Sequence, residues 1–435
     1  MASRTSERRR GPPDASPTVA VVGLGYIGLP TALLLAREQS VVGVDIDEEK
    51  VADIRAGRLP FEEPGLDRLF ADVRDRFRVQ TTVPDAVDTY LIAVPTPLDK
   101  LTDVANLSYV RAATETVADA LDPGDLVVLE STVPPGTSEQ LVQPILDARG
   151  PSGEIRYAYC PERASPGDTL HEMVHNDRVV GCADEATQSR IDGLYEFVEG
   201  ENFLTGPTEA EFVKLMENTY RDVNIALANE FALLAEDYGI DVQETTELAN
   251  EHPRVNVHYA GPGVGGHCLP IDPQFLTQSS TASQLVSTAR DINNSMPVHA
   301  LHLVRSLLSE TNVFEQDSLP QVTLLGVAYK GDVDDTRRTP ALKLHRLAKN
   351  EGYDVRANDP HVEDFEIPLE SMTDAADGSD CLVVVTDHDH YTELDPDEIG
   401  SAMRHRNVVD TRGLLDADRW RDAGFTVRRL GDGRR

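Results

Sequence analysis

Lysine, aromatic residues and cysteine are all scarce in this chain of 435 residues. Six of the 40 basic residues are lysines, aromatic residues make up 6% of the chain, and tryptophan occurs once. The four cysteines, Cys160, Cys182, Cys268 and Cys381, lie far apart without a CxxC pair. That spacing argues against a disulfide framework and against a tetrahedral zinc site. We therefore expect no bound metal and a reducing, cytoplasmic location.

Long apolar runs are missing as well. None approaches the roughly 20 residues that a helix needs to cross a bilayer, so no membrane association is expected. Residues 1–17 are polar, with three adjacent arginines and no apolar core of a signal peptide, and we expect them to form a disordered tail. The 75 acidic residues outnumber the basic ones and give a net charge of −35, which repels nucleic acid. Acidic residues spread along a lysine-poor chain also predict a halophilic protein.

Two regions alternate between apolar strand candidates and helical stretches, the pattern of a doubly wound parallel sheet. In the first region we expect strands at residues 18–23, 40–45, 89–94, 126–130, 156–159 and 178–180. In the second region we expect strands at residues 322–327, 353–358, 381–386 and 407–410, with a helix at 339–350.

The sequence between these regions predicts helices. Apolar residues recur at spacings of three and four from residue 208 to residue 238 without an interrupting Gly or Pro, which predicts one long helix with an apolar stripe. The stripe consists of Phe212, Leu215, Met216, Tyr220, Val223, Leu227, Phe231 and Leu234. A second helix is expected at residues 282–308, kinked or broken at Pro297. Either helix offers a dimerisation face.

The predicted fold class is α/β, with two Rossmann-like doubly wound domains joined by a central helical dimerisation domain. The expected boundaries are residues 18–206, 207–310 and 320–435. A length of 435 residues agrees with two or three domains, and we expect the chemistry to lie between them.

A glycine fingerprint follows the first expected strand. The segment Gly-Leu-Gly-Tyr-Ile-Gly fits GxGxxG, in which glycines permit a tight turn and a close approach of backbone N–H groups to a pyrophosphate. Asp45, 20 residues after Gly25, ends the next strand, where a carboxylate bonds the ribose hydroxyls of NAD and repels the 2′-phosphate of NADP. The expected cofactor is therefore NAD. Its binding residues in this segment are Gly23, Gly25, Tyr26, Ile27 and Gly28.

Two further loops follow strands of the same expected sheet. One reads Val-Pro-Thr-Pro and contains Thr96; the other reads Ser-Thr-Val-Pro-Pro-Gly and contains Thr132. The carboxyl ends of such strands line the cofactor crevice, so both hydroxyls are candidates to bond the nicotinamide ribose or a catalytic water. Threonine beside proline also occurs simply as a turn former.

A glycine-rich loop from Gly261 to Gly266 leads to Cys268. Four glycines let the backbone fold closely around an anion and present a thiol, whereas a core cysteine sits in an apolar strand or helix. Cys268 is therefore the candidate nucleophile, with an incidental loop cysteine as the alternative. The other three cysteines lie in or beside strand patterns, where buried thiols are expected.

The scarcity of lysine makes each one informative. Lys214 and Asn218 are four residues apart on the long helix, so both project from one face and would polarise a carbonyl or stabilise an oxyanion, unless Lys214 is merely a solvated side chain. Lys330 follows the first strand of the last domain, where a phosphate is expected, with Arg337 and Arg338 shortly after it.

Together these motifs resemble the UDP-glucose/GDP-mannose dehydrogenase family from about residue 18 to residue 415. The sequence contains GLGYIGLP, VPTP, STVPPGT, CPER, KLMENTYRDVNIALANE, GPGVGGHCLPIDP and GVAYKGDVDDTR in the family's order. The resemblance implies an NAD-binding domain, a helical dimer-forming centre and a UDP-binding domain. It also implies a cytoplasmic homodimer that oxidises the C6 alcohol of a UDP-sugar to a uronate with two NAD in succession, for polysaccharide biosynthesis.

The resemblance also assigns roles to individual residues. Cys268 would form a thiohemiacetal and then a thioester, and Lys214 would stabilise the oxyanion. Asn218 and Asp272 would hold and polarise a water that Thr132 supports, and Glu162 would be the general base for hydrolysis. The implied substrate-binding residues are Glu162, Lys214, Asn218, Arg254 (across the dimer), Gly265, Lys330 and Arg412. The implied cofactor-binding set adds Lys50, Thr96, Thr132 and Arg337.

One position separates branches of this family. The UDP-glucose branch usually carries a lysine before the aspartate that follows the cysteine, where Ile271 stands here. GPGVGGHC and ENTYRDVNIALANE look more like the dehydrogenases of UDP-N-acetylmannosamine and UDP-N-acetylglucosamine, and we favour UDP-N-acetyl-D-mannosamine. His267 is either a base or a packing residue of this loop. The competing interpretations are a two-electron β-hydroxyacid dehydrogenase, which needs no thiol, and a non-catalytic NAD-binding protein.

Overall fold

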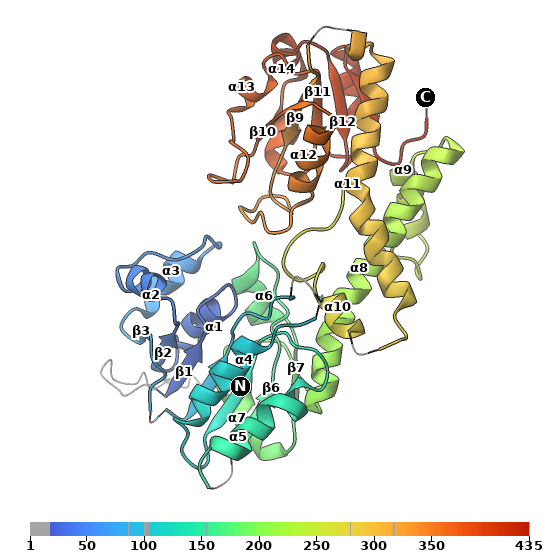
Figure 1. The fold of residues 1–435 in the computed structure, drawn as a ribbon. Helices are drawn as coiled ribbons and strands as arrows, with labels where there is room; N and C mark the ends of the chain where they lie inside the picture. The colour runs from blue at the N-terminus through green and yellow to red at the C-terminus, as the bar shows by residue number, and fades with distance from the viewer. Residues whose placement is uncertain are drawn as a thin grey trace, which may run out of the picture. The chain divides into compact units, whose positions relative to one another are not determined.

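The computed structural model describes residues 18–85, 87–99, 102, 104–152, 155–278, 280–315 and 318–434 (Figure 1). The tail expected at residues 1–17 lies outside them. The chain forms two compact units, one of Met1–Met216 with Gln274–Gln278 and the other of Glu217–Pro273 with Ser279–Arg435. Each unit holds a largely parallel sheet with helices, so the predicted α/β class is confirmed.

The first unit is built on an eight-stranded sheet in the order β3-β2-β1-β4-β5-β6-β7-β8. Every neighbouring pair is parallel except β6 with β7. The strands are β1 (Val19–Val22), β2 (Val41–Val44), β3 (Phe77–Gln80), β4 (Thr89–Ile92), β5 (Leu126–Leu129), β6 (Arg156–Tyr159), β7 (Arg178–Cys182) and β8 (Asn202–Thr205). The helices are α1 (Gly28–Leu35), α2 (Glu48–Arg55), α3 (Leu66–Val73), α4 (Ser108–Ala118), α5 (Gln143–Arg149), α6 (Thr169–His175) and α7 (Glu185–Leu194).

Both faces of this sheet are covered, which explains why its strands are continuous apolar runs. Val19 and Val21 of β1 pack into one hydrophobic cluster with α1 and α3. Ala20 and Val22 pack into another cluster with α4 and α5. The alternation follows from the two-residue period of a strand.

The second unit contains a five-stranded, wholly parallel sheet in the order β10-β9-β11-β12-β13. Its strands are β9 (Gln321–Leu325), β10 (Asp354–Asn358), β11 (Cys381–Val384), β12 (Asn407–Asp410) and β13 (Thr426–Arg429). The helices are α9 (Val242–Asn250), α11 (Gln284–Glu310), α12 (Pro340–Asn350), α13 (Met372–Ala376), α14 (Pro396–Ala402) and α15 (Ala417–Asp422). Helix α10 (Asp272–Thr277) begins in this unit, and its residues from Gln274 onward belong to the first unit. Cys381 and Val383 pack toward α11 and α12, whereas Leu382 and Val384 pack toward α14 and α15.

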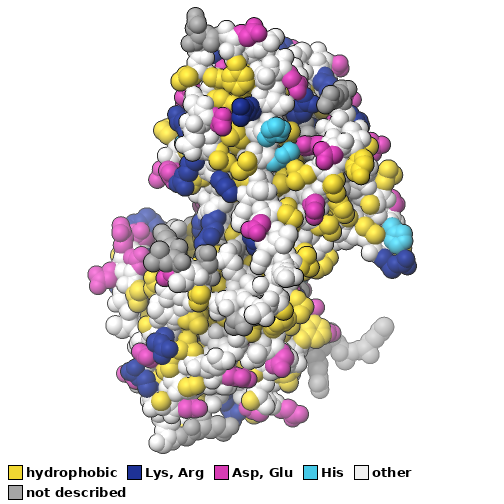
Figure 2. Space-filling view, turned by 45° about the vertical axis from the view of Figure 1, so that its right-hand side comes forward, with side chains coloured by type: hydrophobic (Ala, Val, Ile, Leu, Met, Phe, Trp, Pro, Cys, Tyr) yellow, Lys and Arg dark blue, Asp and Glu magenta, His cyan; other side chains and the backbone are white. Residues whose placement is uncertain are grey.

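The expected long helix is present as α8 (Pro207–Tyr238), which continues from the first unit into the second. Its apolar residues divide between two sides. Leu215 is fully buried, whereas Phe212, Met216, Tyr220, Leu227, Phe231 and Leu234 are each between 40% and 57% exposed. Most of the predicted stripe is therefore open on this single chain. On the face drawn in Figure 2, exposed hydrophobic side chains also stand beside one another, with acidic side chains scattered among them.

Pro297 does not break α11, which continues from Gln284 to Glu310, so the break considered for this position is wrong. Proline has no N–H group and cannot donate to the carbonyl four residues earlier, which belongs to Asn293. Gly263 approaches there: a Cβ atom on Gly263 would lie 3.3 Å from the Asn293 oxygen and from the Pro297 ring. The glycine loop thus lies against α11 at the turn where Pro297 leaves the Asn293 carbonyl without its helical donor.

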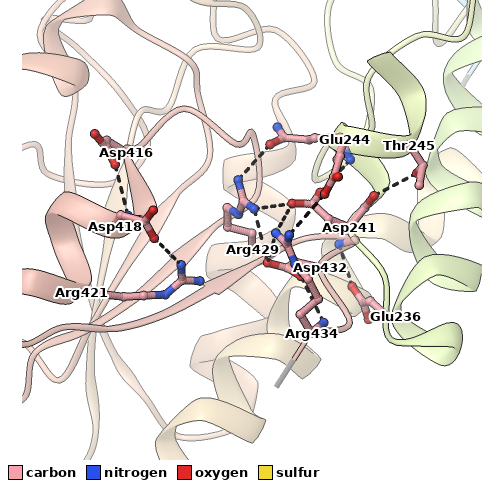
Figure 3. A network of polar contacts seen from close by, with 12 residues as sticks. Glu236, Asp241, Glu244, Thr245, Asp416, Asp418, Arg421, Arg429, Asp432 and Arg434 are labelled. Atoms are coloured by element: carbon pink, nitrogen blue, oxygen red, sulfur yellow. Dashed lines mark hydrogen bonds and ion pairs between the residues drawn. The ribbon is translucent and has the colours of Figure 1, made fainter. Parts of the chain in front are cut away.

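A polar network ties the end of the chain to α8 and α9 (Figure 3). Asp241 caps α9 by accepting from the Gln243 N–H at 2.8 Å, and it also pairs with Arg429 at 2.5 Å and with Arg434. Glu236 of α8 accepts a hydrogen bond from the Gly431 N–H at 2.9 Å. The C-terminal segment is thereby held against the helices of its own unit.

None of the helices in the described part of the chain is long and apolar enough to cross a membrane.

Candidate active site

The glycine fingerprint connects β1 to α1 and leaves room for a ligand at one position. Gly23 has φ +96°, and a Cβ atom on it would lie 2.4 Å from the Ala93 oxygen. A Cβ atom on Gly28 would lie 1.9 Å from the Gly23 oxygen. Nothing lies within 4 Å of a Cβ position on Gly25, whose carbonyl accepts the Leu29 N–H at the start of α1. The backbone at Gly25 is therefore open to a pyrophosphate, and the residues present fit NAD.

Asp45 lies directly after β2 with its carboxylate already oriented. It accepts from the Leu24 N–H at 2.9 Å and the Asp47 N–H at 3.0 Å, and Lys50 pairs with it at 2.8 Å. Burial opposes its ionisation, but Lys50 and the two N–H groups outweigh burial and lower the pKa of Asp45. The aspartate is thus a fixed anion beside the fingerprint, as a ribose acceptor must be.

The two threonine loops are joined to each other. Thr96 donates from its hydroxyl to the Thr132 carbonyl at 2.7 Å, and Ser131 accepts from the Val94 N–H at 2.9 Å. Thr96 is buried and Thr132 is partly exposed. This contact gives Thr96 a structural role in fixing the STVPPG loop, whichever group Thr132 contacts.

Glu162 is buried after β6 and is held by three donors. Its carboxylate accepts from the N–H groups of Arg163 at 2.6 Å and Ala164 at 2.9 Å, and from the Arg178 guanidinium at 2.9 Å. Arg178, at the start of β7, is only 3% exposed. No motif in the sequence singled out Arg178, because its partner is 16 residues away and the pairing exists only in the folded sheet.

Cys268 lies in a loop of the second unit, and its side chain is exposed, whereas Cys160, Cys182 and Cys381 are buried as predicted. The Gly266 N–H donates to the Arg337 carbonyl at 2.8 Å. A Cβ atom on Gly265 would lie 2.6 Å from Tyr329 Cβ. The glycines therefore let the loop lie against the segment around Lys330, and the thiol is presented at its end.

Asp272 begins α10 four residues after Cys268. Its N–H donates to the Cys268 carbonyl at 2.8 Å, and its buried carboxylate accepts from the Asn218 amide at 2.5 Å. The structure thus joins Asn218, Asp272 and Cys268, which lie up to 54 residues apart in the sequence. A carboxylate paired with an amide in this way is able to orient a water.

Lys214 lies one turn before Asn218 on α8 and is only 7% exposed. Among the residues that the structure describes, its Nζ atom has no hydrogen-bond or ion-pair partner. The ammonium therefore has its donors available for a negatively charged or polar ligand.

Four buried polar residues that the sequence analysis missed support the cysteine loop. Asn229 of α8 accepts from the Gly261 N–H at 2.9 Å and donates to Asn293 of α11 at 2.9 Å. Asn293 in turn donates to Asp222 at 2.9 Å, and Asp222 pairs with Arg290. The spacing of Asp222 and Asn229, two turns apart on one helix face, was a signal for a shared role.

The remaining predicted residues lie on the second unit. Lys330 and Arg254 are exposed, Arg412 donates to the Val385 carbonyl at 2.9 Å, and Arg337 makes a bidentate contact with Asp335. Burial and the charges of Arg337 and Arg338 lower the pKa of His267, which favours its neutral form.

The turn after β9 repeats the geometry of the fingerprint. Gly326 has φ +88°, and the buried Asp359 after β10 accepts from the Val327 N–H at 2.6 Å. This is the arrangement of Gly23, Asp45 and Leu24 in the first unit. The second sheet therefore has the local construction of a nucleotide-binding turn beside Lys330.

The class that these features define is the NAD-dependent dehydrogenases of nucleotide substrates. The features are an NAD fingerprint, an ionised aspartate beside it, an exposed loop cysteine and a second nucleotide-binding turn. Comparison with known proteins narrows it. Models of the UDP-glucose/GDP-mannose dehydrogenase family match residues 17–199 (NAD binding domain), 208–295 (central domain) and 323–417 (UDP binding domain). The chain belongs to this family.

The similar proteins include dehydrogenases named for two N-acetylated nucleotide sugars. The chain is 41% identical over 425 residues to a UDP-N-acetyl-D-mannosamine dehydrogenase of Methanocaldococcus jannaschii, which covers 96% of this chain and 97% of the relative. It is 39% identical to an NDP-N-acetyl-D-galactosaminuronic acid dehydrogenase of Ralstonia solanacearum, with coverage of 92% and 97%. The solved UDP-D-ManNAc dehydrogenase of Pyrococcus horikoshii superposes with a TM-score of 0.89 at 41% identity and coverage of 95% and 99%.

These matches confirm the predicted family, the NAD cofactor, the UDP-sugar class of substrate and the oxidoreductase activity. They therefore argue against the two competing interpretations, the two-electron hydroxyacid dehydrogenase and the non-catalytic NAD-binding protein.

Proposed function

We propose that the protein oxidises the C6 alcohol of UDP-N-acetyl-D-mannosamine to the carboxylate with two NAD, through a thioester on Cys268. The observation that carries the proposal is the exposed Cys268 at the end of a glycine loop, joined through Asp272 to Asn218. The names of the similar proteins and Ile271 in place of the branch lysine support the N-acetylated substrate over UDP-glucose. The reaction is assigned to the cytoplasm.

We assign functions to three regions: NAD binding to residues 18–206, helical assembly and the nucleophile to 207–310, and the UDP-sugar to 320–435. NAD would rest on Gly23, Gly25, Tyr26, Ile27 and Gly28, with Asp45 and Lys50 at the ribose and Thr96, Thr132 and Arg337 beside it. When bound, NAD accepts a hydride from C6 in each oxidation. Lys330, Arg412, Gly265 and Arg254 would hold the UDP-sugar, Arg254 from the second subunit of a dimer.

The chain's own groups perform the remaining steps. The Cys268 thiolate adds to the C6 aldehyde, and Lys214 stabilises the alkoxide of the thiohemiacetal. After the second hydride leaves, a water held by Asn218, Asp272 and Thr132 attacks the thioester. Glu162 accepts a proton from that water, the carbon–sulfur bond breaks, and Cys268 leaves as the thiolate. One alcohol, two NAD and one water yield one carboxylate, two NADH and three protons.

The test is the count of NADH formed per sugar nucleotide. Purified protein in molar KCl, chosen because of the net charge of −35, is given NAD and separately UDP-N-acetyl-D-mannosamine, UDP-N-acetylglucosamine or UDP-glucose. We expect two NADH per sugar and the fastest turnover with the mannosamine. One NADH per sugar would show that Cys268 has no part in the mechanism. Faster turnover of another UDP-sugar would show that this other sugar is the substrate.

Asp45→Ala is expected to weaken NAD binding about 10- to 100-fold, because the ribose hydroxyls lose an ionised acceptor. Calorimetric titration with NAD measures the effect. Asp47→Asn is the matched control, since Asp47 is exposed and caps α2, a role that asparagine also performs. Unchanged NAD affinity in the Asp45 variant would show that the ribose site lies elsewhere.

The exposed stripe of α8 is assigned to a dimer with a second copy of the chain. Leu227→Asp is expected to convert the dimer to a monomer, because the stripe repeats at helical spacing over the length of α8 and a buried aspartate is unfavourable. Light scattering after gel filtration measures the mass. Arg221→Asp, an exposed change that lies about 120° around α8 from Leu227 and outside the stripe, is expected to leave the dimer intact. A Leu227 variant that stays dimeric would contradict this assignment.

A further inference from the structure

A buried ionisable cluster surrounds Glu162 and has no part in the mechanism above. Its members follow neighbouring elements of the first sheet: Glu130 after β5, Cys160 after β6, Arg178 at the start of β7 and Tyr195 after α7. All four are at most 3% exposed. Ionisable groups this deeply buried are retained at an energetic cost, so their arrangement calls for a role.

Arg178 is the centre of the cluster. Its guanidinium bonds Glu162 at 2.9 Å and lies over the Tyr195 ring, 4.3 Å from its centroid. The Tyr195 hydroxyl donates to Glu130 Oε1 at 2.5 Å. One guanidinium charge therefore serves two carboxyl groups, Glu162 through a direct bond and Glu130 through space and through the tyrosine that it stacks on.

Glu130 is the member of the cluster whose protonation state changes near neutral pH. Its Oε2 atom is buried and has no hydrogen-bond partner in the described part of the chain. Burial raises the pKa of Glu130 to about 7, with Arg178 and Tyr195 lowering it and the like charge of Glu162 raising it further. Cys160 and Thr31 face Glu130 as well, but burial raises the pKa of the Cys160 thiol to about 11 and threonine does not titrate.

We propose that Glu130 is a positioning residue for Glu162: by competing for the charge of Arg178, it sets how strong a base Glu162 is when the thioester is hydrolysed. This inference rests on the proposed function, in which Glu162 accepts the proton of the attacking water. With Glu130 neutral, the whole positive charge of Arg178 stabilises ionised Glu162, which is then a weak base. With Glu130 ionised, Arg178 is shared and a second negative charge lies nearby, so Glu162 takes a proton more readily.

The direction of the pH effect follows. Glu130 is neutral below about pH 7 and ionised above it. Hydrolysis should therefore accelerate as the pH rises through that value, beyond the general dependence on hydroxide. The expected acceleration is about threefold, a small part of the ~10²- to 10⁴-fold effect of a general base.

The test is the pH profile of thioester hydrolysis in the full-length protein. Enzyme is mixed with NAD and UDP-N-acetyl-D-mannosamine at a series of pH values from about 5.5 to about 9. Each reaction is quenched at successive times, and the Cys268 adduct is followed by intact-protein mass. Glu130→Gln should lose the inflection near pH 7, while NADH formation in the first oxidation stays at the wild-type rate. Asp125→Asn is the matched control: this carboxyl lies just before β5, at the other end of the same strand, and burial raises its pKa too.

A second variant keeps the test valid if Glu130→Gln does not fold. Tyr195→Phe removes the hydroxyl that lowers the pKa of Glu130, so the inflection should move to higher pH without disappearing. A purely structural role of Tyr195 would change the rate at all pH values alike. An inflection that persists unchanged in Glu130→Gln, or does not move in Tyr195→Phe, overturns the inference while two NADH per sugar uphold the proposed function. A wild-type protein that oxidises none of the UDP-sugars overturns both.

Discussion

Cys268→Ala is expected to lower uronate formation by at least ~10³-fold, because the proposed thioester forms on this sulfur and alanine offers no nucleophile. NAD affinity should stay at the wild-type value, since the glycine fingerprint and Asp45 belong to the other unit of the chain. Product analysis by chromatography measures the uronate, and titration calorimetry measures NAD binding. The exposed side chain and the loop position of Cys268 make a folding defect from this change small.

Cys381→Ala is the control for the loss of a thiol. Cys381 is fully buried in β11 of the same unit, so its replacement should reduce stability by about 1 kcal/mol and leave uronate formation intact. Normal uronate formation by Cys268→Ala would end the thioester mechanism. Release of the aldehyde, with one NADH per sugar, would instead show that the first oxidation proceeds without the thiol.

The elements that the sequence predicted are those with a strong local pattern. Buried strands such as β1, β2 and β5 are continuous apolar runs, and α8 carries a regular spacing over 32 residues. The three strands that were missed, β3, β8 and β13, lie at sheet edges and carry exposed or charged residues such as Arg78 and Arg428. Their strand structure comes from pairing with a neighbour rather than from their own composition.

The candidate site divides in the same way. The residues that we propose to contact a ligand lie in short motifs, so Gly25, Asp45 and Cys268 were visible in the sequence. Residues that hold those motifs, such as Asn293 and Arg178, were not visible, because their partners are 64 and 16 residues away. The role of a buried polar residue becomes clear only when the fold shows which group it bonds. In the sequence, the same residue appears only as one member of a helix or strand pattern.

Lys214→Met is expected to lower turnover by about 10²- to 10³-fold, the effect of removing one group that stabilises an oxyanion. The loss should lie in kcat rather than in KM, because the negative charge develops only after the thiolate has added. Initial-rate kinetics with NAD and UDP-N-acetyl-D-mannosamine measure both constants. Lys349→Ala, which removes an exposed lysine of α12, is the control and should change neither.

Stability separates a catalytic Lys214 from a structural one. The Nζ atom of Lys214 has no ion-pair or hydrogen-bond partner among the described residues, so methionine, which fills a similar volume, breaks no polar contact there. The unfolding temperature of Lys214→Met should therefore equal or exceed that of the wild type while activity falls. A variant that loses both stability and activity would assign Lys214 to the scaffold. Lys214→Arg should recover only part of the rate, because the planar guanidinium does not reproduce the compact ammonium.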